Sequence, residues 1–293
     1  MVTAFAFSQT KTYRVGFLLD KNSIEIRSLI DGISNEISAV VGEDAIIEFP
    51  DSSKLVNNFD LAKAFDNYSL LLQNDTDIII AFGIVNNSVI SKIGTYQKPT
   101  IVFGALSEEL LIDETLVSNI ANYTSIFTSQ SYKEDLKLLK TIANPEIVGV
   151  VIEKAFSDNL PIAETFNKIG EELDLETRLI TFESLSDITS NLDNIDAVYI
   201  AGGFYFGDAE MQQLADVLIE KKLPSFTTNP VKDVKNGILA SNQDQSEINQ
   251  VFRRIALTVE SVVNGEDLSD LSTKLESKGA LTVNYNTAKK IGL

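Results

Sequence analysis

The chain contains no cysteine and no histidine among its 293 residues. The first absence excludes disulfides, thiol nucleophiles and cysteine–zinc sites, and the second excludes serine–histidine–aspartate triads and histidine acid–base chemistry. Carboxylates, lysine, tyrosine, serine and threonine remain for catalysis, so carboxylate-only or magnesium chemistry stays open. We expect a protein that is not an enzyme and that needs no cofactor and no metal.

Basic residues are also scarce, with 24 Lys and Arg against 42 Asp and Glu, and the formal net charge is −18. The acidic residues are scattered along the chain, which is typical of a solvated surface. This charge would repel a phosphate backbone or an anionic membrane. We therefore expect no nucleic-acid partner. No apolar run approaches the roughly 20 residues that a membrane-spanning helix requires.

The first nine residues, MVTAFAFSQ, are apolar or small and lack the basic region and the full apolar run of a signal peptide. Ala4, Phe5 and Ala6 form the small-x-small pattern of a cleavage site. We interpret residues 1–12 as a trimmed signal remnant or a disordered segment, and the alternative is a disordered cytoplasmic N-terminus. The export interpretation predicts a periplasmic or otherwise extracytoplasmic protein that is soluble after signal removal.

The length predicts two domains, at roughly 100–200 residues each. From Tyr13 onward short apolar runs alternate with segments of helical period, which is the pattern of βα units that form a mainly parallel sheet. A first series of predicted strands covers residues 15–19, 45–49, 77–82 and 100–103. A second series repeats the plan at residues 147–152, 177–182, 196–201 and 224–227.

The repetition extends to single residues. Asp77 begins a strand that ends at Gly83, and Asp196 begins one that ends at Gly202, so each glycine follows its aspartate by six residues. We predict that the two glycines occupy equivalent strand ends. Four acidic residues precede these strands and are expected to have structural roles at the opposite edge of each sheet, namely Asp75, Asp77, Asp193 and Asp196.

The remaining segment does not begin a third lobe. It contains a predicted strand at 237–241, a long helix at 246–263, a strand at 281–284 and a short helix from Thr287. We assign residues 13–121 and 246–270 to an N-terminal lobe and residues 122–245 and 271–293 to a C-terminal lobe. Such a tail can cross back to complete both lobes, which predicts several hinge strands between them.

Six segments carry a resemblance to a known family, in an order that runs from about Val15 to Leu293: residues 74–80 (NDTDIII), 98–103 (KPTIVF), 148–152 (VGVVI), 196–200 (DAVYI), 237–240 (GILA) and the ending 283–293. The chain resembles ABC-transporter substrate-binding proteins of the type I periplasmic binding fold, related to the tryptophan and tyrosine binders. The resemblance implies two similar α/β lobes, each a mainly parallel sheet flanked by helices, which close on a ligand as a Venus flytrap. It also implies an ABC permease as the membrane partner.

Two departures from the family pattern concern the ligand. Aromatic amino-acid binders carry a His-Pro pair after the first strand, where this chain has residues 20–23 (DKNS), and an Asp-Asn pair after a later strand, where it has residues 202–206 (GGFYF). The acidic partner for a ligand ammonium is therefore not at its usual place. The amino-acid assignment is weakened accordingly.

Ligands of open parallel sheets bind beyond the carboxyl ends of the strands, so the residues that follow each strand are the candidate site. In the first lobe these are Asp20, Asn22, Ser23, Gly83, Ile84, Asn86, Gly104 and Ala105. In the second lobe they are Glu153, Lys154, Gly203, Phe204, Tyr205, Thr227, Thr228 and Asn229. Ser23, Asn86 and Thr228 stand near helix starts, where backbone N–H groups favour an anionic ligand group, and simple helix capping is the alternative.

Three consecutive aromatic residues, Phe204, Tyr205 and Phe206, follow a glycine pair. Glycine lets the backbone approach a ligand closely, and three such rings cannot all face one core. We expect at least one of them to line the interlobe cleft and stack on a ligand, the alternative being a turn with two buried aromatics. The glycine pair lacks the spacing of a nucleotide-binding loop.

The sequence thus predicts a monomeric solute-binding protein that captures a small organic ligand, an amino acid or similar, in the interlobe cleft for an ABC importer. One alternative is an accessory or sensory protein with the same fold that recognises a protein partner through the exposed aromatic run. An enzyme on the flavodoxin-like plan is a third hypothesis, which the missing histidine and cysteine disfavour.

Overall fold

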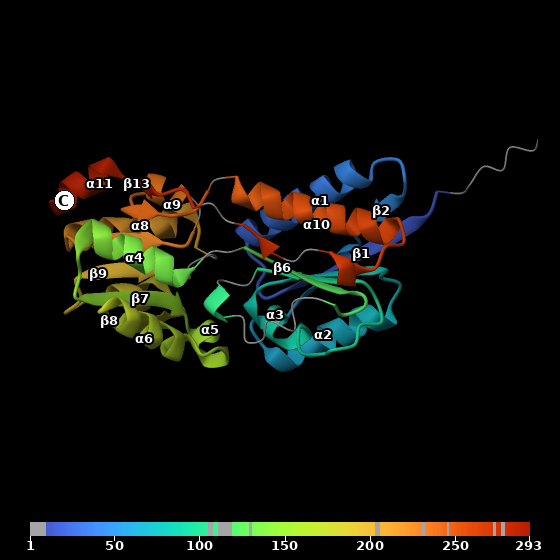
Figure 1. Ribbon diagram of the computed structural model, residues 1–293, viewed down its shortest axis with the longest axis horizontal. Helices are drawn as coiled ribbons and strands as arrows, with labels where there is room; N and C mark the ends of the chain where they lie inside the picture. The colour runs from blue at the N-terminus through green and yellow to red at the C-terminus, as the bar shows by residue number, and fades with distance from the viewer. Residues whose placement is uncertain are drawn as a thin grey trace, which may run out of the picture. The chain divides into compact units, whose positions relative to one another are not determined.

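The computed structural model describes residues 10–104, 108–110, 119–128, 131–202, 206–229, 232–244, 246–271, 274–276 and 279–293. The chain divides into two compact units, the first formed by Met1–Gly104, Glu114–Ile126 and Gln250–Thr273 and the second by Ala105–Asp113, Phe127–Asn249 and Lys274–Leu293. Each unit holds a mainly parallel sheet flanked by helices (Figure 1). The predicted α/β fold with two similar lobes is confirmed.

The first sheet has the strand order β12-β6-β5-β4-β1-β2, with β3 also paired to β1. Its strands are β1 (Thr12–Leu19), β2 (Ile46–Glu48), β3 (Lys54–Val56), β4 (Ile78–Phe82), β5 (Thr100–Phe103), β6 (Tyr123–Thr128) and β12 (Lys274–Leu275), all paired in parallel. Helices cover both faces of a parallel sheet, so its central strands are continuous apolar runs. Ile78, Ile79 and Ile80 of β4 are accordingly all fully buried.

Four helices pack on this sheet: α1 (Ile24–Val41), α2 (Leu61–Gln73), α3 (Ile84–Ile90) and α10 (Glu247–Val263). In α1 the buried residues Ile26, Ile30, Ile33 and Ile37 recur every three or four positions and form one apolar face. Helices α1 and α10 lie on one side of the sheet, and α2 and α3 on the other (Figure 1). Gly32 of α1 lies directly against the Phe252 ring of α10, so a side chain there would collide with it.

The second sheet has the order β13-β11-β10-β9-β7-β8. Its strands are β7 (Ile147–Glu153), β8 (Glu176–Phe182), β9 (Ala197–Ile200), β10 (Ser225–Thr227), β11 (Ala240–Ser241) and the antiparallel β13 (Thr282–Val283). Its helices are α4 (Tyr132–Ala143), α5 (Lys154–Asn159), α6 (Ile162–Leu173), α7 (Leu185–Thr189), α8 (Asp208–Glu220), α9 (Lys232–Lys235) and α11 (Tyr285–Ile291). Among the described residues, no helix is both long and apolar enough to cross a lipid bilayer.

Side chains alternate across strand β9. Val198 and Ile200 belong to a buried cluster that includes Leu214 and other residues of α8. The Tyr199 ring lies on the opposite face, with its centroid 6.1 Å from that of Tyr132 in α4. Because both faces of this strand are covered, the sheet is a buried layer between helices.

Strand β6 differs from the sequence analysis, which predicted no strand at these residues and began the C-terminal lobe at residue 122. Tyr123 to Ile126 pair in parallel with Thr100 to Phe103 of β5, and so belong to the first sheet. The first unit accordingly continues to Ile126. Polar residues in this strand masked its strand character, although Thr124 and Ser125 are buried within the sheet.

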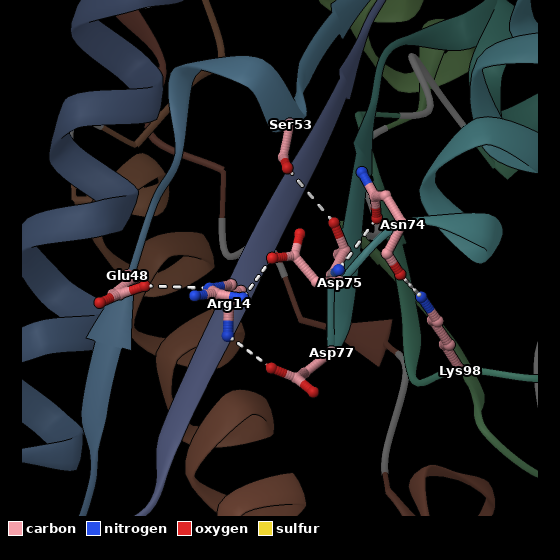
Figure 2. Close-up of polar contacts among 8 residues, drawn as sticks. Arg14, Glu48, Ser53, Asn74, Asp75, Asp77 and Lys98 are labelled. Atoms are coloured by element: carbon pink, nitrogen blue, oxygen red, sulfur yellow. Dashed lines mark hydrogen bonds and ion pairs between the residues drawn. The ribbon is translucent and has the colours of Figure 1, made fainter.

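At the amino-terminal edge of each sheet, an aspartate carboxylate links two neighbouring strands. In the first unit the Asp77 carboxylate accepts a hydrogen bond from the backbone N–H of Arg14 at 2.8 Å. The Arg14 side chain contacts Glu48 and Asp75, as Figure 2 shows. In the second unit the Asp196 carboxylate accepts the equivalent bond from the backbone N–H of Ile147 at 2.9 Å. The predicted structural role of the two aspartates at this edge is confirmed.

Candidate functional site

Four residues follow the strands along the carboxyl edge of the first sheet. Leu19 of β1 pairs with Val56 of β3 and with Phe82 of β4, so Asp20 stands between Asn57 and Gly83. Gly104 follows β5 beside Gly83, because Phe82 pairs with Phe103. The structure thus places the predicted residues Asp20, Gly83 and Gly104 side by side at one edge.

Asp20 is fully buried and its carboxylate is engaged within the unit. Oδ2 accepts a hydrogen bond from the backbone N–H of Val85 at 2.8 Å, and Oδ1 accepts from the backbone N–H of Asn86 at 3.1 Å and from Nδ2 of Asn57 at 2.8 Å. Burial raises the pKa of Asp20 to about 6, and these hydrogen bonds oppose the increase. The carboxylate therefore joins the ends of β1, β3 and β4 to the start of α3.

At two predicted positions of this edge, steric overlap explains why the residue is glycine. Gly83 has φ +107°, and a Cβ atom there would overlap the Asp20 carboxylate. Gly104 has φ +86°, and a Cβ atom there would lie 2.6 Å from the ring of Phe82. Both backbone conformations are ones that residues with a side chain rarely adopt. Each glycine thus allows a neighbouring side chain to pack onto the backbone of the edge.

The other predicted residues of the first unit have local partners. Ser23 caps α1, since its Oγ accepts a hydrogen bond from the backbone N–H of Ile26 at 3.2 Å. The Asn22 side-chain oxygen accepts from the Arg27 guanidinium at 2.8 Å. Asn86 is buried inside α3, where its Nδ2 donates to the Phe82 carbonyl at 2.9 Å, and Ile84 is buried beside it. Helix capping, which the sequence left open for Ser23, is the role that the structure gives it.

The carboxyl edge of the second sheet repeats the arrangement of the first. Val151 of β7 pairs with Ile200 of β9, so Glu153, the last residue of β7, lies beside Gly202. Glu153 is buried, and a Cβ atom on Gly202 would overlap its carboxylate. Gly83 and Gly202 therefore occupy equivalent strand ends, as the shared spacing predicted. Lys154 points to a different partner and forms an ion pair with Asp158 at 2.5 Å.

The next strand of this edge, β10, ends at the buried Thr227, and two further buried polar residues follow it. Thr227 Oγ1 accepts a hydrogen bond from the backbone N–H of Asn229 at 3.0 Å, and Thr228 Oγ1 donates to the Ile200 carbonyl at 3.3 Å. Asn229 Nδ2 donates to the Gly202 carbonyl at 3.1 Å. The three predicted residues thus tie the ends of β9 and β10 together.

One acidic residue near this edge was not predicted. Asp233 of α9 is buried, which raises its pKa to about 6, while a hydrogen bond with the Asn229 side chain opposes the increase. Within the part of the chain that the structure describes, neither Oδ1 of Asn229 nor Oδ2 of Asp233 accepts a hydrogen bond. Both oxygens are buried and keep the capacity to accept a hydrogen bond. The spacing of four residues between Asn229 and Asp233 was the only sequence signal.

Four predicted residues lie outside the described residues, namely Ala105, Gly203, Phe204 and Tyr205. The third aromatic of that run is described. Phe206 is buried in the core of the second unit, and its ring centroid lies 5.0 Å from that of Phe182. Phe206 therefore packs within its own unit, which was the alternative that the sequence left open for part of the aromatic run.

Sequence reasoning also missed the loop after β3, because it did not predict that strand. Asn57 is buried, and its Nδ2 donates to Asp20 and, at 3.1 Å, to Asn86. Phe59 follows two residues later and is half-buried. A predicted third strand next to β1 would have placed both residues at the carboxyl edge.

No protein-family model matches the chain, and no curated protein matches its sequence. Solved structures do match it. An ABC domain from Streptococcus pneumoniae in complex with L-Trp has a TM-score of 0.69 at 17% identity, with 96% of this chain and 95% of that chain covered. A conserved domain protein from Vibrio cholerae has a TM-score of 0.70 at 16% identity, with 97% and 95% covered.

A third structure, an ABC-transporter solute-binding protein from Agrobacterium vitis bound with α-D-tagatopyranose, has a TM-score of 0.60 at 11% identity, with 94% of this chain and 95% of that chain covered. A LacI-family transcriptional regulator from Silicibacter pomeroyi also matches, with a TM-score of 0.60 at 12% identity and 96% and 83% covered. The chain therefore has the fold of type I periplasmic binding proteins. The predicted resemblance to ABC-transporter substrate-binding proteins is confirmed at the level of the fold.

Proposed function

We propose that this chain is a solute-binding protein that captures a small organic molecule with the residues beyond the carboxyl ends of its strands. The ligand is an amino acid or a molecule of similar size, and an ABC importer receives it. The protein works outside the cytoplasm as a monomer and catalyses no reaction. Asn229, Asp233 and the loop that follows β3 supply the ligand contacts among the described residues.

The observation that carries this proposal is the repetition at the two carboxyl edges. Each edge has an acidic residue at the carboxyl end of its first strand and a glycine beside it, Asp20 with Gly83 and Glu153 with Gly202. In open parallel sheets this edge is where ligands bind. Catalysis would require one set of reacting groups in one place, whereas two similar polar edges provide hydrogen-bonding groups in both units.

The comparisons support a small organic ligand in general terms. The structures similar to this chain include complexes with an amino acid and with a sugar. Transcriptional regulators share the fold, but the net charge of −18 opposes binding to DNA. An accessory or sensory protein that recognises a protein partner is the alternative function. The departures from the family pattern after the first strand support that alternative.

A thermal-shift panel tests the proposal on protein purified without refolding. The panel begins with aromatic and branched amino acids and continues with nucleosides, small carboxylates and sugars. A ligand at about 100 times its Kd adds roughly 2.7 kcal/mol to the stability of the native state. For chains of 150–250 residues, each added kcal/mol raises the Tm by roughly 2–4 °C, provided that the units unfold together. The bound ligand should therefore raise the Tm by several degrees.

Two variants test whether the ligand binds at a carboxyl edge or at an amino edge of a sheet. Asn229→Ala removes a carboxyl-edge amide, whereas Asp75→Ala removes an exposed carboxylate at an amino edge. We expect the first variant to lose the stabilisation by ligand and the second to retain it. If no compound stabilises the wild type and native mass spectrometry finds no retained molecule, the solute-binding proposal is wrong and the accessory-protein function is favoured.

A further inference from the structure

The chain contains two asparagine–glycine pairs, Asn236-Gly237 and Asn264-Gly265. Asparagine is chemically labile, and it is most reactive before glycine, because no Cβ atom hinders the approach of the glycine nitrogen to the asparagine side chain. Each pair directly follows or closely follows the last residue of a helix, the first pair at α9 and the second at α10. The two pairs therefore have similar places in the fold.

The backbone hydrogen bonds of the two pairs are also the same. In each pair the asparagine N–H donates to the carbonyl four residues earlier, at 3.0 Å for Asn236 and 2.9 Å for Asn264. The glycine N–H donates to the carbonyl three residues earlier, at 3.2 Å for Gly237 and 3.0 Å for Gly265. Both glycines have positive φ. The helix ends thus hold the two pairs alike.

Tertiary contacts hold the first pair in addition. Nδ2 of Asn236 donates to the Asp208 carboxylate at 3.4 Å, and the Gly237 carbonyl accepts a hydrogen bond from Thr287 Oγ1 at 2.8 Å. Gly237 also packs on α8, where an added Cβ atom would lie 3.0 Å from the Cβ atom of Ala215. Residues of α8 and α11 therefore keep this half-buried pair in place.

The second pair lacks such support. Asn264 and Gly265 are both exposed, and within the described part of the chain the Asn264 side chain makes no hydrogen bond. An added Cβ atom on Gly265 would have no neighbour within 4 Å. This pair can leave its conformation by breaking only the hydrogen bonds of the helix end.

We propose that Asn264 is a site of spontaneous deamidation and that Asn236 is protected from it. The Gly265 nitrogen loses its proton to solvent and attacks Cγ of Asn264. The new N–C bond closes a succinimide ring, the bond from Cγ to Nδ2 breaks, and ammonia leaves. Water then opens the ring at either carbonyl and yields aspartate or isoaspartate. The reaction needs no enzyme, metal or oxidant.

The modification changes the end of α10. Both products place a negative charge at the C-terminus of the helix, where the helix dipole is also negative and where Glu260 and Glu266 flank Asn264 in the sequence. Isoaspartate also lengthens the main chain by one carbon atom, which displaces the hydrogen bond from the Glu266 N–H to the Ser261 carbonyl. We expect the modified protein to have a Tm lower by roughly 1–4 °C.

Peptide mass spectrometry tests the proposal on native protein that is incubated at mildly alkaline pH and sampled over time. The gain in mass that accompanies conversion of an amide to a carboxylate locates each modified asparagine. We expect Asn264 to deamidate at least about tenfold faster than Asn236, because two additional hydrogen bonds must break at the first pair. The rate should rise with pH, because the attacking nitrogen must lose its proton. Equal rates in the native protein, or a faster reaction at Asn236, would overturn the proposal.

Three controls separate the fold from the local sequence. In urea both pairs lose their structure, so the two rates should approach each other, and a persistent tenfold difference would contradict the role of the fold. Thr287→Val removes the hydroxyl that holds Gly237 and should accelerate the reaction at Asn236 only. An unchanged rate at Asn236 in this variant would contradict the protection by tertiary contacts. Asn264→Gln should keep its Tm during the incubation, whereas the Tm of the wild type falls.

Discussion

The Asp20 carboxylate occupies the space that a side chain on Gly83 would require. Asp20 and Gly83 form a frame of four residues with Arg14 and Asp77. Arg14 lies six residues before Asp20, and Asp77 lies six residues before Gly83. The backbone N–H of Arg14 donates a hydrogen bond to the Asp77 carboxylate. The second unit repeats this frame with Ile147, Glu153, Asp196 and Gly202. The two units thus share the contacts that set the register of their central strand pairs.

The first prediction concerns Gly83. Gly83→Ala adds a Cβ atom that overlaps the Asp20 carboxylate and imposes a side chain on a residue with φ +107°. Steric overlap and backbone strain act together, so the variant should lose roughly 3–5 kcal/mol of the free energy of unfolding. Urea denaturation followed by circular dichroism measures this loss. Gly94→Ala is the matched control, because Gly94 has φ +74° but no atom within 4 Å of an added Cβ. It should lose only the cost of the backbone conformation, about 1–2 kcal/mol. Equal losses in the two variants would show that the Asp20 carboxylate does not require glycine at position 83.

The second prediction concerns pH. Burial raises the pKa of Asp20 in the folded protein to about 6, above the ordinary aspartate value of 3.8. The folded state therefore holds the proton more tightly than the unfolded state does. The contribution to stability is fully present below about pH 4 and is lost as the pH rises through about 6, by at most about 3 kcal/mol.

The variant Asp20→Asn isolates this contribution. The difference in unfolding free energy between wild type and variant should change between about pH 4 and pH 7, in the direction that favours the wild type at low pH. Asp233 has a pKa raised in the same direction by burial, so the variant retains part of the pH dependence. Chemical denaturation at several pH values measures it. A difference that stays constant across this range would contradict the assigned pKa of Asp20.

The third prediction concerns the amino edge of the second sheet. The Asp196 carboxylate accepts hydrogen bonds from the backbone N–H groups of Ile147 at 2.9 Å and Glu146 at 3.1 Å. Asp196→Ala removes both and should lower the unfolding free energy by about 1–3 kcal/mol. Asp193→Ala removes an exposed ion pair with Lys221 and should change it by less than about 1 kcal/mol. Thermal and urea denaturation compare the two variants, and an equal effect would contradict the bridging role of Asp196.

Much of the fold followed from the sequence because the strands of a parallel sheet are continuous apolar runs. Residues 77–82 and 196–201 stand out for this reason, and their shared spacing to Gly83 and Gly202 located equivalent strand ends. Strands β3 and β6 escaped prediction because Lys54–Val56 is only three residues long and Tyr123–Thr128 is largely polar. Whether these two segments form strands depends on pairing with a neighbouring strand, which no local sequence pattern indicates.

The candidate site was less predictable than the fold. Position after a strand identified Asp20, Glu153 and Asn229, but the sequence could not show that Asp20 is fully buried and bonded to α3. Asn57 and Phe59 were missed together with β3. The backbone N–H of Phe59 is bonded to the side chain of its near neighbour Asn57, which is held in turn by Asp20, a residue distant in sequence.

A crystal structure of the protein, purified without refolding and grown with the compound that raises its Tm most, tests the solute-binding account most directly. The account predicts electron density for one small molecule beyond the carboxyl ends of the strands of a sheet, in contact with the residues that follow those strands. Density for the compound at the amino edges, beside Asp77 or Asp196, would contradict it.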